Sequence, residues 1–179
     1  MRVALSYLRS QMQIAYLKSA DGVDVNATLA ELAARLLDDG LRVVGTTQTN
    51  TARLDTHKCD MDVRVLPDGD IIRISQNLGP KSRGCQLDPD ALEQAVAATL
   101  TRLEGADLLI INKFGKHEAD GRGFREVIGA AMERGIPVLV GTNGLNLQAF
   151  LDFTDRAATC LPCDLDQLSS WAQALKTAA

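Results

Sequence analysis

Residues 107–111, with the sequence Asp-Leu-Leu-Ile-Ile, constrain the fold of this chain more than any other stretch. Four consecutive apolar residues after one acid are typical of a strand that is buried on both faces of a sheet. Residues 92–103 and 124–132, on either side of it, carry apolar side chains at helical spacing. Because strands that alternate with helices form parallel sheets, we expect a sheet with helices on both faces.

The other elements continue this alternation. We expect further strands over 12–17, 41–48 and 136–141, and further helices over 25–37, 145–153 and 164–176. Asp88 and Pro89 suit the cap and the first position of the helix before the buried strand. Residues 63–65 and 72–74 alternate between apolar and polar around a turn, which predicts an antiparallel hairpin. The predicted fold is a three-layer α/β domain whose mainly parallel sheet carries an inserted antiparallel β-hairpin.

Length and composition suit a single domain. The chain has 179 residues, of which 46% are hydrophobic and 23% charged. We predict one domain over 12–179 and a loose N-terminal extension over 1–11, because the first convincing strand starts at Met12. A run of about 18 apolar residues is missing, so no membrane span is expected. With no clear signal peptide and few cysteines for a disulfide framework, the expected location is the cytoplasm.

The charge distribution favours a small anionic partner. The net charge is −4 and aromatic residues make up 4%, so nucleic-acid binding is not expected. Residues 49–85 and 112–125 nevertheless hold ten Lys and Arg against seven Asp and Glu. We interpret these basic segments as loops and a hairpin, where they would attract an anion. A homo-oligomer is compatible with this composition.

The carboxyl ends of the parallel strands are the expected ligand-binding edge. Four segments should converge there, namely 18–26, 46–60, 112–123 and 141–146, and the hairpin and the loop at 76–87 would fold over them. Within the first segment, a phosphate-binding loop would need several glycines and a Gly-Lys-Ser/Thr sequence. Only Gly22 is present, and Asp24 is placed to cap the following helix. An ordinary capped turn therefore explains this segment.

Several segments together resemble the small P-loop nucleoside-triphosphatases related to a thermophilic enzyme of broad nucleotide specificity. Gly22-Val23 and Thr28-Leu29 align with the phosphate loop of that family, and Val44-Gly45-Thr46-Thr47-Gln48-Thr49 with a glycine-containing strand end. Asn112-Lys113-Phe114-Gly115-Lys116-His117-Glu118 matches the segment Asp-Glu-Ile-Gly-Lys-Met-Glu of that family. More closely, the chain resembles a bacterial family of unknown function that accompanies molybdenum-transport genes.

This resemblance implies a P-loop NTPase type of fold over residues 12–150 with degenerate Walker motifs. The phosphate-loop Lys is missing, and Asn112-Lys113 stands where the enzymes have Asp-Glu at the strand end. Because Asn112 cannot neutralise a magnesium ion, there is no strong case for a magnesium–nucleotide complex. The cofactor stays unknown, and the resemblance to the closer family implies no established activity.

The candidate ligand-binding residues are mostly cations in the basic loops. Because a hairpin brings its two ends together, the clusters before and after it should be neighbours. A Gly-Pro-Lys-Ser-Arg-Gly sequence after the hairpin offers backbone N–H groups and two cations to an oxyanion. The full set is Gly22, Arg53, Lys58, Lys81, Arg83, Asn112, Lys113, Lys116 and Arg122.

Two further groups carry candidate chemistry. Glu118 and His117 would act as bases if the protein is an enzyme. Cys59, Cys85 and His57 could bind a soft metal, although their spacing matches no standard zinc motif. Cys160 and Cys163 have CxxC spacing without a second pair, and their role stays open.

The leading functional hypothesis is a non-hydrolysing binding protein for a phosphate-bearing ligand or an oxyanion, with molybdate as one candidate. One alternative is a deviant nucleoside-triphosphatase or phosphotransferase. Another is a partner in metal-cofactor assembly that uses Cys59 and Cys85.

Overall fold

The computed structural model describes residues 13–54, 59–77, 79 and 86–178. Five of the candidate site residues lie outside this part of the chain, namely His57, Lys58, Lys81, Arg83 and Cys85. The extension expected over residues 1–11 lies outside it as well.

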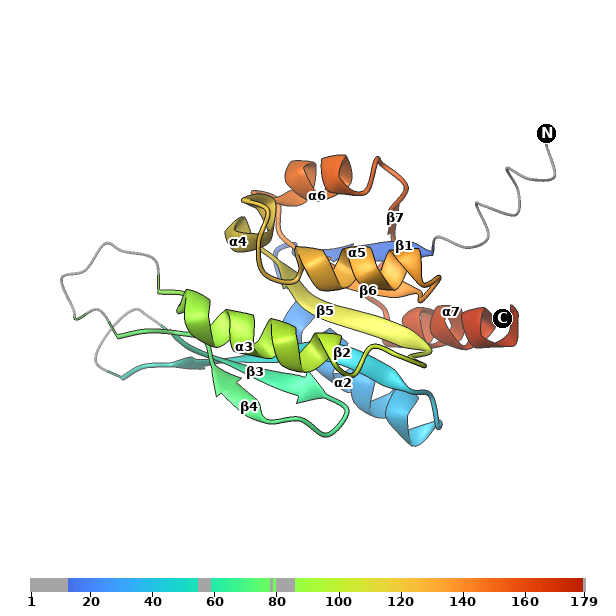
Figure 1. The fold of residues 1–179 in the computed structure, drawn as a ribbon, viewed down its shortest axis with the longest axis horizontal. Helices are drawn as coiled ribbons and strands as arrows, with labels where there is room; N and C mark the ends of the chain where they lie inside the picture. The colour runs from blue at the N-terminus through green and yellow to red at the C-terminus, as the bar shows by residue number, and fades with distance from the viewer. Residues whose placement is uncertain (1–12, 55–58, 78, 80–85, 179) are drawn as a thin grey trace.

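One seven-stranded sheet forms the centre of the molecule (Figure 1). Its strand order is β4-β3-β2-β5-β6-β1-β7. The strands are β1 (Ile14–Lys18), β2 (Val43–Ala52), β3 (Cys59–Leu66), β4 (Ile71–Arg73), β5 (Leu108–Phe114), β6 (Val138–Thr142) and β7 (Thr159–Cys160). The pairings from β2 through β5, β6 and β1 to β7 are all parallel. This confirms the mainly parallel sheet that the sequence predicts.

The antiparallel part of the sheet is larger than the sequence suggests. The expected hairpin is present, with Val63 opposite Ile72. In addition, β2 continues to Ala52 and pairs with β3 from Gly45 onward. The strand end expected at Gln48 is therefore too early. The residues after Gln48 are polar and exposed, so their sequence gives no sign that the strand continues beyond the core. The inserted strands extend the sheet sideways instead of folding over it.

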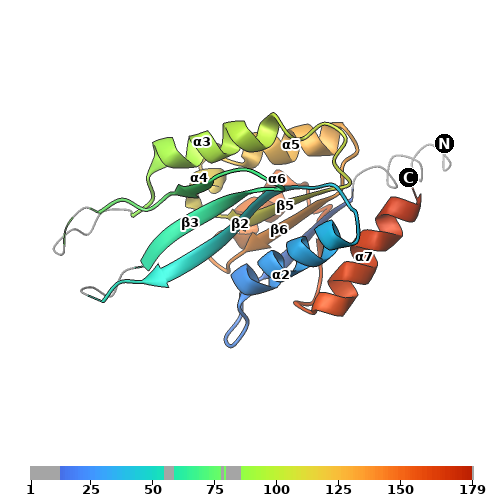
Figure 2. The same ribbon diagram turned by 90° about the horizontal axis from the view of Figure 1, so that it is seen from below.

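Helices cover both faces, as expected. They are α2 (Val25–Asp38), α3 (Pro89–Leu100), α4 (Lys116–Ala119), α5 (Arg125–Glu133), α6 (Leu147–Phe153) and α7 (Leu165–Ala178). Figure 2 shows α3 and α5 on one side of the sheet and α2 and α7 on the other. Each face has its own apolar core, and β5 contributes alternate residues to both: Leu109 and Ile111 to one, Leu108 and Ile110 to the other.

Local sequence signals explain where the helices begin. Asp24 caps α2, because its carboxylate accepts a hydrogen bond of 3.0 Å from the Ala27 N–H. Asp88 caps α3 in the same way, with Pro89 at the first helical position. Both caps are as predicted. In the described part of the chain, no helix has the length and hydrophobicity needed to cross a membrane.

Candidate functional site

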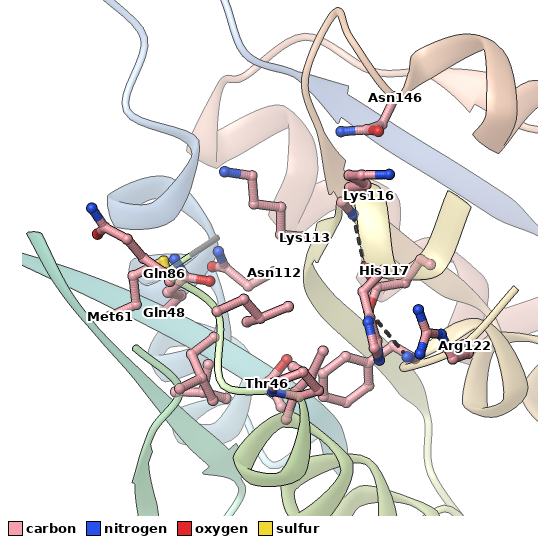
Figure 3. A pocket seen from close by; sticks show the side chains of 18 of the residues that line it. Thr46, Gln48, Met61, Gln86, Asn112, Lys113, Lys116, His117, Arg122 and Asn146 are labelled. Atoms are coloured by element: carbon pink, nitrogen blue, oxygen red, sulfur yellow. Dashed lines mark hydrogen bonds between the residues drawn. The ribbon is translucent and has the colours of Figure 1, made fainter. Parts of the chain in front are cut away.

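A cavity of about 610 Å³ opens at the carboxyl end of the sheet on the face that α3 covers (Figure 3). We call it the α3-face cavity. Strands β2, β3 and β5, helix α3 and the α4 segment contribute most of its walls. Its lining residues are Thr46, Gln48, Met61, Val63, Ile74, Gln76, Gln86, Leu87, Pro89, Leu92, Asn112, Lys113, Gly115, Lys116, His117, Glu118, Asp120, Arg122, Phe124, Asn143 and Asn146.

Three of the four segments expected at the ligand-binding edge contribute to this cavity. They are 46–60, 112–123 and 141–146, and the ends of the 76–87 loop join them. The segment 18–26 contributes no lining residue. The turn at the phosphate-loop position lies next to α2, on the opposite face of the sheet. The phosphate-loop position therefore lies outside the cavity, although Asn112 lines the cavity and bonds Asn26 at the start of α2.

Polar side chains of β2 form part of the cavity wall among apolar neighbours. Thr46 and Gln48 are two residues apart, so both project from the same face of the strand. They are only 2% and 6% exposed. Val63, Leu92 and Phe124 belong to the apolar core beside them. The inner part of the cavity thus offers hydrogen-bonding groups in apolar surroundings.

Three predicted ligand-binding cations meet at the cavity. Lys113 lies near the end of β5, Lys116 begins α4, and Arg122 lies in the turn after α4. The Lys116 ammonium lies 3.1 Å from the Asp120 carboxylate, in an exposed ion pair of the i,i+4 type. In the described part of the chain, Lys113 and Arg122 take part in no ion pair. These two charges are therefore available to an anion.

Glu118, predicted as a candidate base, is 3% exposed and turned toward backbone groups. Its carboxylate accepts hydrogen bonds from the N–H groups of Gly115, at 2.9 Å, and Phe124, at 3.2 Å. Burial raises the pKa of Glu118, although both hydrogen bonds oppose this shift. Gly123 makes room for this arrangement, because a Cβ at its position would lie 2.4 Å from a carboxylate oxygen of Glu118. The Glu118 carboxylate thus holds the α4 segment in place.

His117 pairs with an acid that sequence reasoning missed. Its Nε2 lies 3.1 Å from Oε1 of Glu93 on α3. The same oxygen accepts a hydrogen bond of 3.1 Å from the Gly123 N–H. The imidazole therefore links α3 to the α4 segment at the wall of the cavity. Glu93 gave no signal in the sequence, since it lies among the exposed residues of an amphipathic helix.

The tip of β5 is where a P-loop enzyme holds its magnesium ion, between a strand-end acid and a helix-start Ser or Thr. At this tip, Asn112 Nδ2 donates a hydrogen bond of 2.9 Å to Oδ1 of Asn26, which lies in the first turn of α2. Asn112 is 3% exposed, and its own Oδ1 is buried with no hydrogen-bond partner in the described chain. Magnesium sites in proteins normally use carboxylates. Two neutral amides do not fit this ion, and we derive no chemistry through it.

Gly22 and Arg53, two further predicted binding residues that the structure describes, do not line the cavity. Gly22 is exposed in the turn before α2, and a Cβ there would meet no atom within 4 Å. The Arg53 guanidinium pairs with Asp60 across the β2–β3 ladder. This contact holds the pKa of Asp60 below its usual value, and the Arg73 guanidinium at 3.0 Å adds to the shift. The two sides of the hairpin are neighbours as predicted, since Ser75 Oγ accepts a hydrogen bond of 3.0 Å from the Met61 N–H.

The cysteines form no metal cluster in the residues that the structure describes. Cys59 is exposed at the start of β3, and its predicted co-ligands lie outside these residues. Across the described ranges, no three His, Cys, Asp or Glu side chains meet in a way that would hold a metal ion. Cys160 and Cys163 are both free, and the Cys163 thiol donates to the Thr28 hydroxyl at 3.3 Å.

The amide-bearing lining residues are the main part of the site that sequence reasoning did not single out. Gln48, Gln76, Gln86 and Asn146 all contribute to the cavity. One signal was available for Gln48, because Thr46 and Gln48 are polar and two residues apart at the carboxyl end of an apolar strand.

Comparisons with known proteins support the fold and give the family. The solution structure of a human cancer-related nucleoside triphosphatase matches 93% of this chain and 96% of its own, with a TM-score of 0.59 and 17% identity. This likeness confirms the P-loop NTPase-like α/β fold. A molybdenum import ATP-binding protein, ModC 2 of Bradyrhizobium diazoefficiens, is 34% identical over 149 residues. The match covers 83% of this chain but only 17% of that protein.

A family model matches residues 14–171, which is nearly all of the described chain. Its description is "Protein of unknown function (DUF2478)". The resemblance inferred from the strand ends and the Asn112–Glu118 segment agrees with all three comparisons. The chain belongs to the DUF2478 family.

Proposed function

We propose that this protein binds a phosphate-bearing ligand or an oxyanion in the α3-face cavity without hydrolysing it. The observation that carries the proposal is the pair of unpaired cations, Lys113 and Arg122, beside a cavity of about 610 Å³. Small-molecule sites have volumes of about 300–1,000 Å³. Molybdate is one candidate oxyanion, because a molybdenum import protein contains a segment similar to this chain.

The charges around the cavity favour an anion over a metal–nucleotide complex. The Asp120 carboxylate neutralises Lys116, and Glu118 is engaged by backbone N–H groups. Burial raises the pKa of Glu118 and so disfavours its negative charge. Since Asn112 and Asn26 supply no charge to a magnesium ion, a bare anion gains more from this site than its magnesium complex.

Isothermal titration calorimetry of the purified chain tests the proposal with phosphate, sulfate, molybdate, AMP and ATP, each with and without magnesium. We expect at least one of them to bind, and to bind no more tightly when magnesium is present. Lys113→Gln and Arg122→Gln should each weaken that binding about tenfold, the value of one charge-assisted hydrogen bond.

Lys18→Gln is a matched control, because Lys18 is exposed at the end of β1, beside the phosphate-loop position and outside the cavity. It should leave binding unchanged. Silence from every anion would rule the proposal out. Binding that is lost in Lys18→Gln but kept in Lys113→Gln would move the site to the phosphate-loop position.

The His117–Glu93 pair favours one alternative, a deviant nucleoside-triphosphatase or phosphotransferase. A carboxylate that orients an imidazole beside a cavity is a known arrangement for a general base. Under this alternative, the purified chain would release phosphate steadily from ATP or GTP, and His117→Asn would stop the release. A rate equal to that of a buffer blank would exclude it.

A further inference from the structure

We propose that the ligand has a second, neutral part: a nitrogen heterocycle that lies inside the α3-face cavity with its edge at Thr46 and Gln48. Its anionic group would lie at Lys113 and Arg122. This inference rests on the proposed function, since both concern the same cavity. It adds the chemical class of the ligand, which an anion site alone does not define.

Two nearly buried polar groups on β2 carry the inference. The Gln48 Nε2 donates a hydrogen bond of 2.8 Å to Asn50 Oδ1. Within the described chain, the Gln48 carboxamide oxygen and the Thr46 hydroxyl take part in no hydrogen bond, yet neither atom is sealed from the cavity. A buried polar group without a partner costs free energy. Both groups are therefore set to receive a ligand that hydrogen-bonds with them.

The walls beside these groups are apolar. Val63, Ile74, Leu92 and Phe124 all line the cavity and belong to the core on this face. An inorganic oxyanion, with a volume on the order of two water molecules, would fill only a small fraction of the space. The rest would then hold water against apolar side chains. A ligand with an apolar body leaves no such water.

A flat heterocycle satisfies both features at once. Its faces are apolar, whereas its edge carries N–H donors and ring-nitrogen acceptors in one plane. The Gln48 oxygen needs a donor, and the Thr46 hydroxyl can donate or accept. An aliphatic chain would leave both groups unpaired. A sugar would press its hydroxyl groups against the apolar wall.

The position of the cations agrees with a ligand in two parts. Lys113 and Arg122 are exposed, whereas Thr46 and Gln48 are among the most buried polar residues. In Figure 3, Arg122 lies across the cavity from Gln48, and Lys113 lies between them, above Thr46. An anionic group would thus remain near solvent while the ring is enclosed.

Calorimetric titrations with AMP, GMP, ribose 5-phosphate, inorganic phosphate and guanosine test the inference on the full chain. We expect AMP or GMP, whichever binds better, to bind at least tenfold more tightly than ribose 5-phosphate. Such a gain is typical of one well-made polar contact plus apolar burial. The nucleoside should bind more weakly than its monophosphate, because it lacks the charge for Lys113 and Arg122.

Gln48→Met removes the hydrogen-bond acceptor and keeps the side-chain volume. It should therefore lower the affinity for AMP or GMP to the affinity for ribose 5-phosphate. Its effect on ribose 5-phosphate should be small. Gln148→Met is the matched control, because the Gln148 Nε2 also bonds a neighbouring side chain, Asp152 at 2.8 Å, outside the cavity. Thr46→Val serves as a second variant if Gln48→Met unfolds, as judged by its thermal melt.

The outcomes separate the two proposals. If AMP, GMP and ribose 5-phosphate bind with equal affinity, and Gln48→Met changes none of these affinities, the inference is wrong while anion binding stands. If no probe binds, or if Lys113→Gln and Arg122→Gln change nothing, the proposed function fails and the inference fails with it.

Discussion

The two faces of the β5 tip differ in how completely their polar groups are used. On the α2 face, at the phosphate-loop position, the Asp24 carboxylate caps α2 and Asn112 Nδ2 donates to Asn26, although the buried Asn112 Oδ1 has no partner in the described chain. On the α3 face, the Lys113 ammonium and the side-chain oxygens of Thr46 and Gln48 have no partners in the described chain. Most polar groups of the α2 face thus bond within the chain, whereas the α3 face keeps more of them for the proposed ligand.

This difference supports the placement of the proposed ligand site on the α3 face. At the phosphate-loop position, the Asp24 carboxylate occupies the positive end of the helix that a phosphate would need. The cations have instead gathered at the other face, after β5. The proposed site therefore lies at the same edge of the sheet, on the face opposite the phosphate-loop position.

The largest effect is expected from Gly141→Ala, which tests whether the α2 face is closely packed. A Cβ at this position would lie 2.3 Å from the Asn112 carbonyl oxygen and 3.1 Å from Leu29 and Val25 side-chain atoms. The backbone of β5 or β6 would have to shift, at a cost of about 3 kcal/mol in the free energy of unfolding. Urea unfolding measures this loss.

Gly144→Ala is the control for that change, because a Cβ there meets no atom within 4 Å. It should change the free energy of unfolding by less than about 0.5 kcal/mol. If both variants were equally stable, the α2 face would have room for a ligand and the contrast between the faces would disappear.

A smaller effect is expected from Asn112→Asp, which restores an acid to the strand tip. Without metal, the buried carboxylate beside Asn26 should cost about 1–3 kcal/mol. Magnesium should then raise the melting temperature of the variant but not that of the native chain, because only the variant has a charged oxygen ligand.

Asn77→Asp is the matched control for this substitution. Asn77 is exposed, and its Oδ1 accepts a hydrogen bond from the Gly79 N–H that an aspartate would keep. A magnesium-dependent melting temperature in the native chain would show that the amide pair already holds the ion. That result would overturn our interpretation of the strand tip.

The smallest and most gradual effect is the pH dependence that Glu118 contributes on the α3 face. Burial raises its pKa above the ordinary value of 4.5, so the folded chain holds this proton at pH values where the unfolded chain has lost it. Its contribution to the free energy of unfolding is therefore full below pH 4.5 and falls as pH rises through the raised pKa. Glu118→Gln removes this fall.

Urea unfolding at several values between about pH 5 and about pH 8 measures the difference between the native chain and Glu118→Gln. Asp60 does not interfere there, because its pKa lies below the ordinary value of 3.8 and its contribution is lost only in more acidic solution. For Glu126→Gln, at an exposed position on α5, the free energy of unfolding should change with pH as it does in the native chain. If the free energy of unfolding of Glu118→Gln changed with pH as that of the native chain does, the raised pKa of Glu118 would be contradicted.

Much of the fold could be predicted because its signals are local. Continuous apolar runs marked β5 and β6, and Asp24 and Asp88 marked the starts of α2 and α3. The second half of β2 was missed, since its polar residues look like a loop unless the partner strand β3 is known. The short helix α4 was missed too, because it depends on hydrogen bonds to Glu118 from groups on both sides.

The candidate site divides in the same way. Lys113, Lys116 and Arg122 were predicted from their charge and their place after a strand, and they do line one cavity. Contacts between side chains of distant segments could not be predicted from the sequence. Only the structure joins Arg53 to Asp60 and His117 to Glu93.

The sequence by itself determined the alternating α/β order, the edge of the sheet that carries polar groups, and the absence of a strand-end acid at Asn112. These follow from apolar periodicity and residue chemistry, which act over a few positions. Tertiary structure decided which face of that edge stays open. That choice depends on which polar groups bond each other in the folded chain, as Asn26 Oδ1 does with Asn112 Nδ2 and no described residue does with the Gln48 side-chain oxygen.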